Sequence, residues 1–502
     1  MTQSLQASVS DHTNTAPNGS SRADGCAEFD ATARVTSENN TDVAAVILAA
    51  GAGTRMKSRK PKVAHEVLGK PLVAWVIDAA RKAHISSIVT VVGHLREQVI
   101  PLVERYSQCA IQEERLGTAN AVSCGIASLD APYVLVLSGD CPLIEASTLL
   151  QLVHAAQSGN TVGSFLTMNC ENPYGYGRVL HDDNACACGI VEEKDATDDQ
   201  RAITCCNAGF YCFNTAWLRE TLQGLTCDNA QGEWYLTDCV ARAYQQHQAM
   251  VEVPCTDAAQ CSGINSRSQL AHVTRLAQQR INARHMDAGV TFTDPTQAWI
   301  GPDVELENDV EILPQTMLYG SCVVKQGSVI GPHTRLVDVH VGENCSVEET
   351  IAYESAIHDK ASIGPRAYIR PGCTVCYGAK VGTCVEIKHT TVGKFSKVPH
   401  LSYLGDASVG EHVNIGAGSI TCNYDGAHKY PTTIEDNVFV GSDTMMVAPV
   451  TLGAGSLIGA GSTITADVSP DALALARARQ VEFEKGALKL SLIHISEPTR
   501  LL

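Results

Sequence analysis

A glycine-rich segment near the start of the chain combines backbone N–H groups with two cations, and this combination suits the binding of phosphate. The segment reads LAAGAGTRM from Leu48 to Met56, and KSRKPK follows it. Glycines let backbone N–H groups face phosphate oxygens without obstruction by a Cβ atom, while Arg55 and Lys62 supply charge. The segment is neither a Walker loop nor a dinucleotide fingerprint, because Gly-Lys-Ser/Thr and the third glycine are missing. A bare glycine-rich turn can also be structural, so the trailing Pro-Lys makes the pattern more specific.

A second candidate is Asp140, which follows the apolar run YVLVL in the string SGDCPL. An aspartate after a strand is often only a helix cap. At the carboxyl end of a parallel strand, however, it lies where α/β sheets bind their ligands.

Polar residues able to assist acyl transfer gather later in the chain, at Arg370, Lys388, His400, Tyr403 and the string NYDG, residues 423–426. Histidine, with an ordinary pKa of about 6.5, suits a general base near neutrality, and Arg or Lys suits an anionic substrate. Taken singly, each has a plainer interpretation: a solvated histidine, a surface lysine and an ordinary turn.

The elements around these later residues follow a six-residue period. Apolar residues recur every six positions from Ile300 to Leu336, from Ile357 to Ile387 and from Ile434 to Ile464. This period predicts one short strand and one turn for each side of a prism, stacked into a solenoid. Two interruptions, residues 393–408 and 416–433, are expected to be loops that project outward.

The earlier part of the chain alternates short apolar runs with helical segments from Val43 to about Arg267, which predicts a mostly parallel α/β sheet. We expect a disordered extension over residues 1–42, an α/β domain over 43–267, a linker helix over 268–289 and a β-helix domain over 290–486. Residues 487–502 form an aberrant tail, because LSLIHISEPTRLL has no solenoid period and is interpreted as a sequence artefact.

The composition and charge of the chain exclude several classes of function. The net charge of −17 argues against a nucleic-acid or membrane-surface binder, since both need a basic footprint. No apolar run is long enough to span a membrane, and residues 1–42 hold no apolar signal segment. The 20 cysteines show no zinc spacing, so we expect mostly reduced thiols and a cytoplasmic location.

The motifs together resemble two enzyme families. LAAGAGTRM with Pro61-Lys62, and then LGTA, SGDCPL, GYGR, GIVEEKD, NAG and GIN in this order, resemble the sugar-nucleotide pyrophosphorylases, which have a Rossmann-like α/β nucleotidyltransferase fold. The six-residue repeat resembles the left-handed parallel β-helix of hexapeptide-repeat acyltransferases. Their combination, over roughly residues 43–485, resembles the bifunctional N-acetylglucosamine-1-phosphate uridylyltransferase/glucosamine-1-phosphate N-acetyltransferase family.

The resemblance implies two reactions in the synthesis of UDP-N-acetylglucosamine, a cell-wall precursor. Glucosamine-1-phosphate is acetylated from acetyl-CoA, and the N-acetylglucosamine-1-phosphate formed then receives a uridylyl group from UTP, with Mg²⁺ as cofactor. For uridylyl transfer, the implied residues fall into four groups. They are the metal ligands Asp140 and Asn265; the triphosphate cations Arg55 and Lys62; the nucleotide contacts Leu48, Ala49, Gly51, Gly53, Gln112, Gly117 and Thr118; and the sugar contacts Gly177, Glu192 and Asn207.

For acetyl transfer, the resemblance implies His400 as the general base, with Glu386 orienting it. The implied sugar-phosphate contacts are Arg370, Lys388, Tyr403, Asn414, Asn423 and Tyr424, and the implied acetyl-CoA contacts are Ala417, Ser442, Ala460 and Arg477. It also implies a homotrimer with active sites between neighbouring prisms.

Two departures from the family pattern concern substrate selectivity. Arg115 stands where many relatives carry Gln, and Ser138 stands where some carry Tyr. Two alternatives remain beside the bifunctional enzyme: a pyrophosphorylase for another sugar whose β-helix only regulates or oligomerises, and a scaffold that binds UDP-sugars without turnover. Intact Arg55, Lys62, Asp140, Asn265 and His400 argue against the scaffold, and His400 with the NYDG loop argues against a mere spacer.

Overall fold

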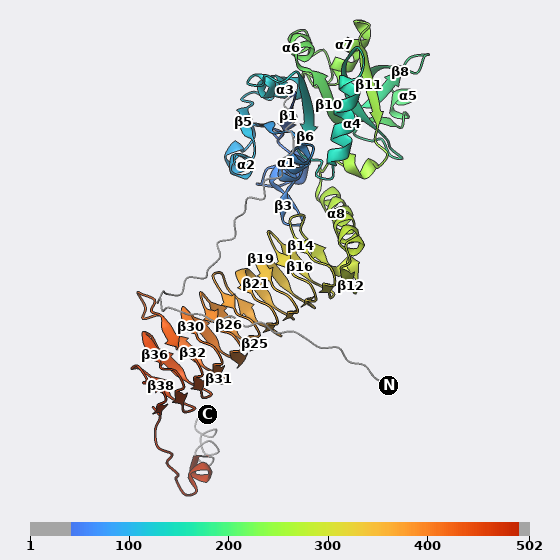
Figure 1. Ribbon diagram of the computed structural model, residues 1–502. Coiled ribbons are helices and arrows are strands. Elements are labelled where there is room, and N and C mark those ends of the chain that lie inside the picture. Colours follow the sequence, from blue (N-terminus) through green and yellow to red (C-terminus); the bar gives the residue numbers. More distant parts are fainter. Residues whose placement is uncertain (1–41, 491–502) are drawn as a thin grey trace, which may run out of the picture. The chain divides into compact units, whose positions relative to one another are not determined.

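The computed structural model describes residues 42–490 (Figure 1). The extension expected over residues 1–42, apart from Asp42, and the part of the expected tail beyond residue 490 lie outside the described residues. Within residues 42–490, no helix is both long enough and apolar enough to cross a membrane.

The first part of the described chain is built on a nine-stranded sheet whose main path runs β11-β7-β10-β6-β1-β4-β5. The strands on this path are β1 (Val43–Leu48), β4 (Ser87–Val92), β5 (Gln108–Ile111), β6 (Tyr133–Ser138), β7 (Thr161–Asn169), β10 (Cys205–Asn214) and β11 (Ala249–Pro254). Strand β10 runs antiparallel to both its neighbours, β6 and β7, and the other pairs on the path are parallel. A hairpin of β8 (Arg178–His181) and β9 (Ala187–Val191) joins the sheet through β10.

Helices cover both faces of this sheet, which explains its apolar strands. Alternate residues of β1 point to opposite faces: Val43, Ala45 and Ile47 join one core, and Ala44 and Val46 join another. The helices are α1 (Leu72–Lys82), α2 (Arg96–Val103), α3 (Thr118–Ile126), α4 (Ala146–Gln157), α5 (Asp198–Arg201), α6 (Thr215–Gln223), α7 (Asp238–Gln245) and α8 (Arg267–Asp287). The α/β prediction is therefore confirmed.

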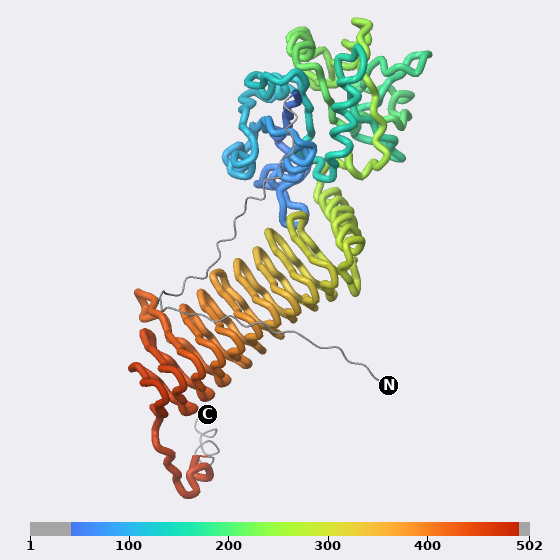
Figure 2. Tube along the Cα trace, viewed as in Figure 1, coloured from blue at the N-terminus to red at the C-terminus, as the bar shows by residue number. Residues whose placement is uncertain are grey.

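The chain after α8 forms a parallel β-helix, as its six-residue period predicts (Figures 1 and 2). Its strands, from β12 (Thr291–Phe292) to β39 (Leu473–Ala474), pair in an 11-stranded and a 17-stranded sheet. Partner residues on successive coils are commonly 18 apart, as where Leu318 lies opposite Leu336 and Val440 opposite Ile458. Each coil therefore has three six-residue sides, and the apolar residue of each side points into the prism.

One of the two loop predictions is wrong. Residues 393–408 continue the coil through β28 (Lys397–His400), β29 (Tyr403–Gly405) and β30 (Ala407–Val409). Val398 and Leu404 take the interior positions of the prism and are fully buried. The six-residue apolar period therefore continues through this polar segment. The second interruption does hold an insertion, because the spacing between coils rises to 25 where Asn414 lies opposite Phe439. The insertion is nevertheless shorter than expected, since β32 (Ile420–Cys422) keeps its place in the sheet.

Candidate active sites

A cavity of about 700 Å³ opens beside the ends of strands β1 and β6. Parallel strands deliver their carboxyl ends to one edge of a sheet, and loops at that edge form ligand sites. The lining residues are Leu48, Ala49, Ala50, Gly51, Ala52, Gly53, Thr54, Lys62, Val63, Gln112, Arg115, Gly117, Thr118, Ala121, Ser138, Asp140 and Glu233. All seven predicted nucleotide contacts are in this set.

Two glycines allow the cavity wall to form. Gly53 has a positive φ of 58°, and a Cβ atom there would lie 2.6 Å from Cβ of Lys62. Gly117 has a φ of 115°, and a Cβ atom there would lie 2.4 Å from the carbonyl oxygen of Trp234. Any side chain at either position would both strain the backbone and collide with its neighbour.

Lys62 links the two residues predicted to hold the metal ion. Its ammonium forms an ion pair with the Asp140 carboxylate and lies 3.1 Å from Oδ1 of Asn265. One cation therefore contacts a carboxylate oxygen from the turn after β6 and an amide oxygen from the loop before α8. Oxygen donors that converge on one positive charge fit a hard divalent ion, which prefers such ligands.

The remaining predicted residues of this cavity differ in their surroundings. Gln112 is buried, and its side-chain amide donates to Asn120 Oδ1 at 2.7 Å and to the Gly117 carbonyl at 3.2 Å. Arg55 lies exposed on a short 3-10 helix, Thr54–Met56, and is not among the lining residues. Glu233 also lines the cavity. The sequence did not predict this residue, because it lies in a loop without a periodic pattern.

The three predicted sugar contacts lie together beside β10, outside the lining of the cavity. The Asn207 N–H donates to the Gly177 carbonyl at 2.8 Å, and a Cβ atom at Gly177 would lie 3.5 Å from Oε1 of Glu192. Thr237 donates its hydroxyl to the same Glu192 oxygen at 3.1 Å, and burial raises the pKa of Glu192. Ser138, which lines the cavity, donates to the Gly209 carbonyl at 3.1 Å and so connects the two regions.

On the β-helix, several predicted sugar-phosphate contacts surround one carboxylate that sequence reasoning missed, Asp406. Both of its oxygens lie 3.3 Å from Nζ of Lys388, and it also accepts a hydrogen bond from the Asn423 amide. Burial works against its ionised form, but the Asn423 and Lys388 contacts outweigh this and lower the pKa of Asp406. Tyr403 lies near, since a Cβ atom at Gly405 would lie 2.3 Å from its hydroxyl and 2.7 Å from Nδ2 of Asn423.

The register of strand pairing between successive coils brings Asp406 next to Lys388. Strand β26 (Glu386–Lys388) pairs with β29, which sets Glu386 opposite Tyr403 and Lys388 opposite Gly405. Asp406 directly follows β29 and therefore reaches Lys388 on the preceding coil. No motif marks Asp406 in the sequence, because the contact arises from stacking of coils.

The Glu386 carboxylate, which the resemblance implies as an orienting partner of His400, pairs with the Arg370 guanidinium at 3.1 Å. His400 ends β28 with its side chain exposed. It belongs to the 11-stranded sheet, as does Asn414 of β31 (Asn414–Ile415), whereas Lys388 and Tyr403 belong to the 17-stranded sheet. Tyr424 is exposed and donates to the Gly426 carbonyl at 2.5 Å.

The four predicted acetyl-CoA contacts form a column along one edge of the prism. Ala417, Ser442 and Ala460 follow matching strands of successive coils. Gly461 N donates to the Ser442 carbonyl at 2.8 Å, and Arg477 donates to the Ala460 carbonyl at 2.8 Å. Stacking is close, since a Cβ atom at Gly441 would lie 2.5 Å from the Ala460 nitrogen.

Comparison with known proteins gives one family match in each part of the chain. Residues 45–187 match a family described as the MobA-like NTP transferase domain, and residues 431–466 match the hexapeptide repeat of succinyl-transferase. The chain is 47% identical over 437 residues to the bifunctional protein GlmU of Heliobacterium modesticaldum, which covers 87% of this chain and 95% of that protein.

Relatives from other bacteria match to a similar extent. The GlmU of Desulfitobacterium hafniense is 46% identical over 443 residues, covering 88% of this chain and 97% of its own. The GlmU of Mycolicibacterium smegmatis is 43% identical over 455 residues, which cover 89% of this chain and 94% of that protein. Both halves of the fold are therefore shared with these relatives. The chain belongs to the GlmU family of bifunctional enzymes, and it joins uridylyltransferase and acetyltransferase activities in one polypeptide.

Proposed function

We propose that the two activities use separate sites, divided at α8: the cavity beside β1 and β6 for uridylyl transfer, and the edge of the β-helix for acetyl transfer. The observation that carries the first assignment is the convergence of Asp140 and Asn265 on the Lys62 ammonium. These oxygens would hold Mg²⁺, which, when bound, neutralises phosphate charge during transfer.

In uridylyl transfer, a phosphate oxygen of N-acetylglucosamine-1-phosphate attacks the α-phosphorus of UTP, and the bond to pyrophosphate breaks. Such a reaction depends on positioning and on charge neutralisation more than on a covalent protein group. Lys62 and the backbone N–H groups of the turn around Gly51 and Gly53 would hold the triphosphate. Arg55, exposed next to this turn, would supply a further cation. Glu192 and Asn207 would hold the amino sugar, and Gln112 the base.

In acetyl transfer, the amine of glucosamine-1-phosphate attacks the thioester carbon of acetyl-CoA and must lose a proton. His400 would accept that proton, and the coenzyme A thiolate would leave. Arg370 and Lys388 would bind the sugar phosphate, with Tyr403, Asn414, Asn423 and Tyr424 as further contacts. Acetyl-CoA would lie along the column that ends at Arg477.

The acetyltransferase site is proposed to need more than one copy of the chain. His400 and Asn414 lie in one sheet of the prism, whereas Lys388 and Tyr403 lie in the other. A substrate held between neighbouring prisms would then be enclosed by residues of two copies. We therefore propose a homotrimer of about three times the 53.4 kDa chain. Because its substrates UTP and acetyl-CoA are made inside the cell, we also propose a cytoplasmic location.

The decisive experiment supplies each substrate combination to the purified chain, with and without Mg²⁺, and identifies the products by mass. We expect N-acetylglucosamine-1-phosphate from glucosamine-1-phosphate and acetyl-CoA without Mg²⁺, and UDP-N-acetylglucosamine only when UTP and Mg²⁺ are added. Uridylyl transfer without any acetyl transfer would reduce the β-helix to a structural module. Binding of UDP-sugar without either product would favour a scaffold.

A further inference from the structure

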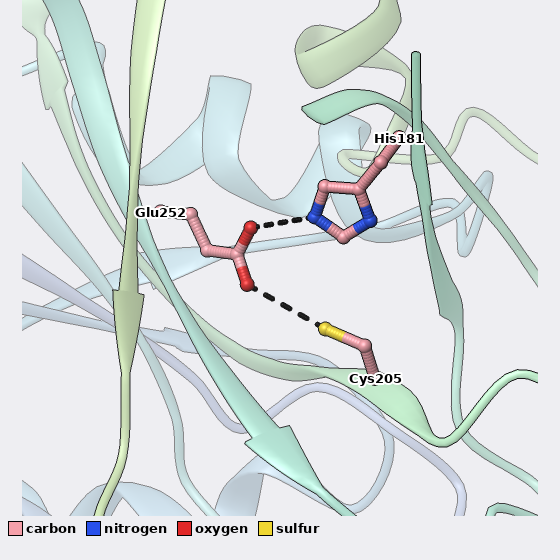
Figure 3. A group of neighbouring side chains, drawn as sticks. All are labelled: His181, Cys205 and Glu252. Atoms are coloured by element: carbon pink, nitrogen blue, oxygen red, sulfur yellow. Dashed lines mark hydrogen bonds and ion pairs between the residues drawn. The ribbon is translucent and has the colours of Figure 1, made fainter. Parts of the chain in front are cut away.

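Three strands of the first sheet bring an imidazole, a thiol and a carboxylate together at a place that neither reaction uses. His181 ends β8, Cys205 begins β10 and Glu252 lies within β11 (Figure 3). Nε2 of His181 lies 2.8 Å from one Glu252 oxygen, and Sγ of Cys205 lies 3.5 Å from the other. The three donor atoms all lie within 4.8 Å of one another.

The sheet topology explains why the sequence gives no sign of this cluster. Its members are 24 and 47 residues apart, whereas sequence motifs for metal sites place ligands a few residues apart. Strands β10 and β11 flank β7, where Cys205 lies opposite Asn169 and Glu252 opposite Phe165. The hairpin strand β8 pairs with β10 and delivers His181 from the far side.

The donor atoms match one class of metal ion. Imidazole nitrogen, thiolate sulfur and carboxylate oxygen are the ligands that Zn²⁺ and similar divalent ions take. Bond lengths of about 2.0–2.3 Å in a tetrahedral arrangement put neighbouring donors about 3.3–3.8 Å apart. Because the widest pair here lies within 4.8 Å, small side-chain rotations would complete such a geometry.

The cluster is also accessible, with the side chains of His181 and Glu252 exposed by 31% and 28%. An ion and the waters that fill its remaining positions can therefore reach it. Glu252 already receives three donors, since the Thr167 hydroxyl donates to it at 2.9 Å. This hydroxyl holds the carboxylate in place, as the outer hydrogen bonds of metal sites commonly do.

We propose that His181, Cys205 and Glu252 form a site for a divalent transition metal of the zinc class, separate from the site of Asp140 and Asn265. Binding would replace the thiol proton of Cys205 with the metal ion and release that proton to solvent. The ion would tie β11 to the β8–β9 hairpin and to β10. These elements also carry the proposed sugar contacts: Gly177 precedes β8, Glu192 follows β9 and Asn207 lies within β10.

The test uses Co²⁺ as a spectroscopic probe with the reduced, full-length chain freed of metal. Cobalt bound to a thiolate gives a charge-transfer band in the near ultraviolet, and tetrahedral cobalt gives intense visible bands. We expect both bands, and we expect Zn²⁺ to abolish them by displacement. Cys205→Ser should remove the charge-transfer band, while His181→Gln and Glu252→Gln should each weaken cobalt affinity by about tenfold or more.

Cys227→Ser is the matched control, because Cys227 is an exposed thiol outside the cluster, and it should keep both bands. Circular dichroism and the Mg²⁺-dependent uridylyl transfer of each variant show that it has folded. Should Cys205→Ser fail to fold, the two other variants carry the test. A wild-type chain without a cobalt–thiolate band would overturn the proposal. So would bands that persist at unchanged affinity when the cluster residues are replaced.

Discussion

Replacing Asp406 with Asn removes a charge from the centre of the proposed sugar-phosphate site while keeping its shape. Asp406 is 20% exposed and Lys388 only 10% exposed, so their ion pair is largely shielded from water. The Asn423 amide also donates to Asp406, and His389 Nδ1 lies 3.3 Å from it. The substitution would therefore loosen two groups proposed to contact glucosamine-1-phosphate.

The size of the effect follows from these contacts. A hydrogen bond to a charged group contributes about 1.5–3 kcal/mol, and an asparagine oxygen can keep part of it. We therefore expect kcat/KM for glucosamine-1-phosphate to fall by about 5- to 150-fold, which corresponds to about 1–3 kcal/mol. Because Asp406 acts through Lys388 and Asn423, most of the change should lie in KM for the sugar phosphate and little in KM for acetyl-CoA.

The assay is steady-state acetyl transfer with each substrate varied in turn, with uridylyl transfer from supplied N-acetylglucosamine-1-phosphate as an internal reference. Asp359→Asn is a suitable control, because Asp359 is an exposed carboxylate on another coil of the β-helix. A variant whose kcat/KM for glucosamine-1-phosphate stays within about twofold of wild type would refute this positioning role.

Three further predictions follow from the same structure. Asp140→Asn should nearly abolish uridylyl transfer and spare acetyl transfer, and parallel loss of both in a folded variant would contradict separate sites. His400→Ala should slow acetyl transfer by about 10²–10⁴-fold, whereas a change within about twofold would exclude the base role. Burial lowers the pKa of His285 to about 4, so the unfolded chain takes up a proton below about pH 6.5 that the folded chain does not. Stability should therefore fall by about 2 kcal/mol between pH 7 and pH 5, and His285→Gln should lose this slope in thermal melts.

The sequence predicted the β-helix well because its period is a direct consequence of the fold. Each side of the prism needs one inward apolar residue, so Leu318, Leu336, Val440 and Ile458 repeat at intervals set by the geometry. The same rule also explains the wrong loop over residues 393–408. The polar residues between Val392 and Val409 favour a loop prediction, although Val398 and Leu404 keep the six-residue period.

Contacts between coils and between strands could not be predicted in the same way. Asp406 and Lys388 are 18 residues apart, one coil of the prism, and nothing local in the sequence ties them together. The resemblance implies that Glu386 orients His400, whereas the stacking of β23 (Tyr368–Ile369) on β26 pairs Glu386 with Arg370. Pairing of side chains depends on register, which a single sequence does not specify.

The two proposed sites differ in how readily a sequence motif reveals them. The site proposed for uridylyl transfer includes glycines that are locally required, since a Cβ atom at Gly53 or Gly117 would collide with Lys62 or Trp234. Such requirements leave a local motif that can be recognised. The residues proposed for acetyl transfer are distributed by the solenoid over two sheets, with His400 in one and Lys388 in the other. A site assembled in this way leaves no compact motif. We expect assembly and acetyl transfer to be lost together when the copies are separated, because the proposed site lies between neighbouring prisms.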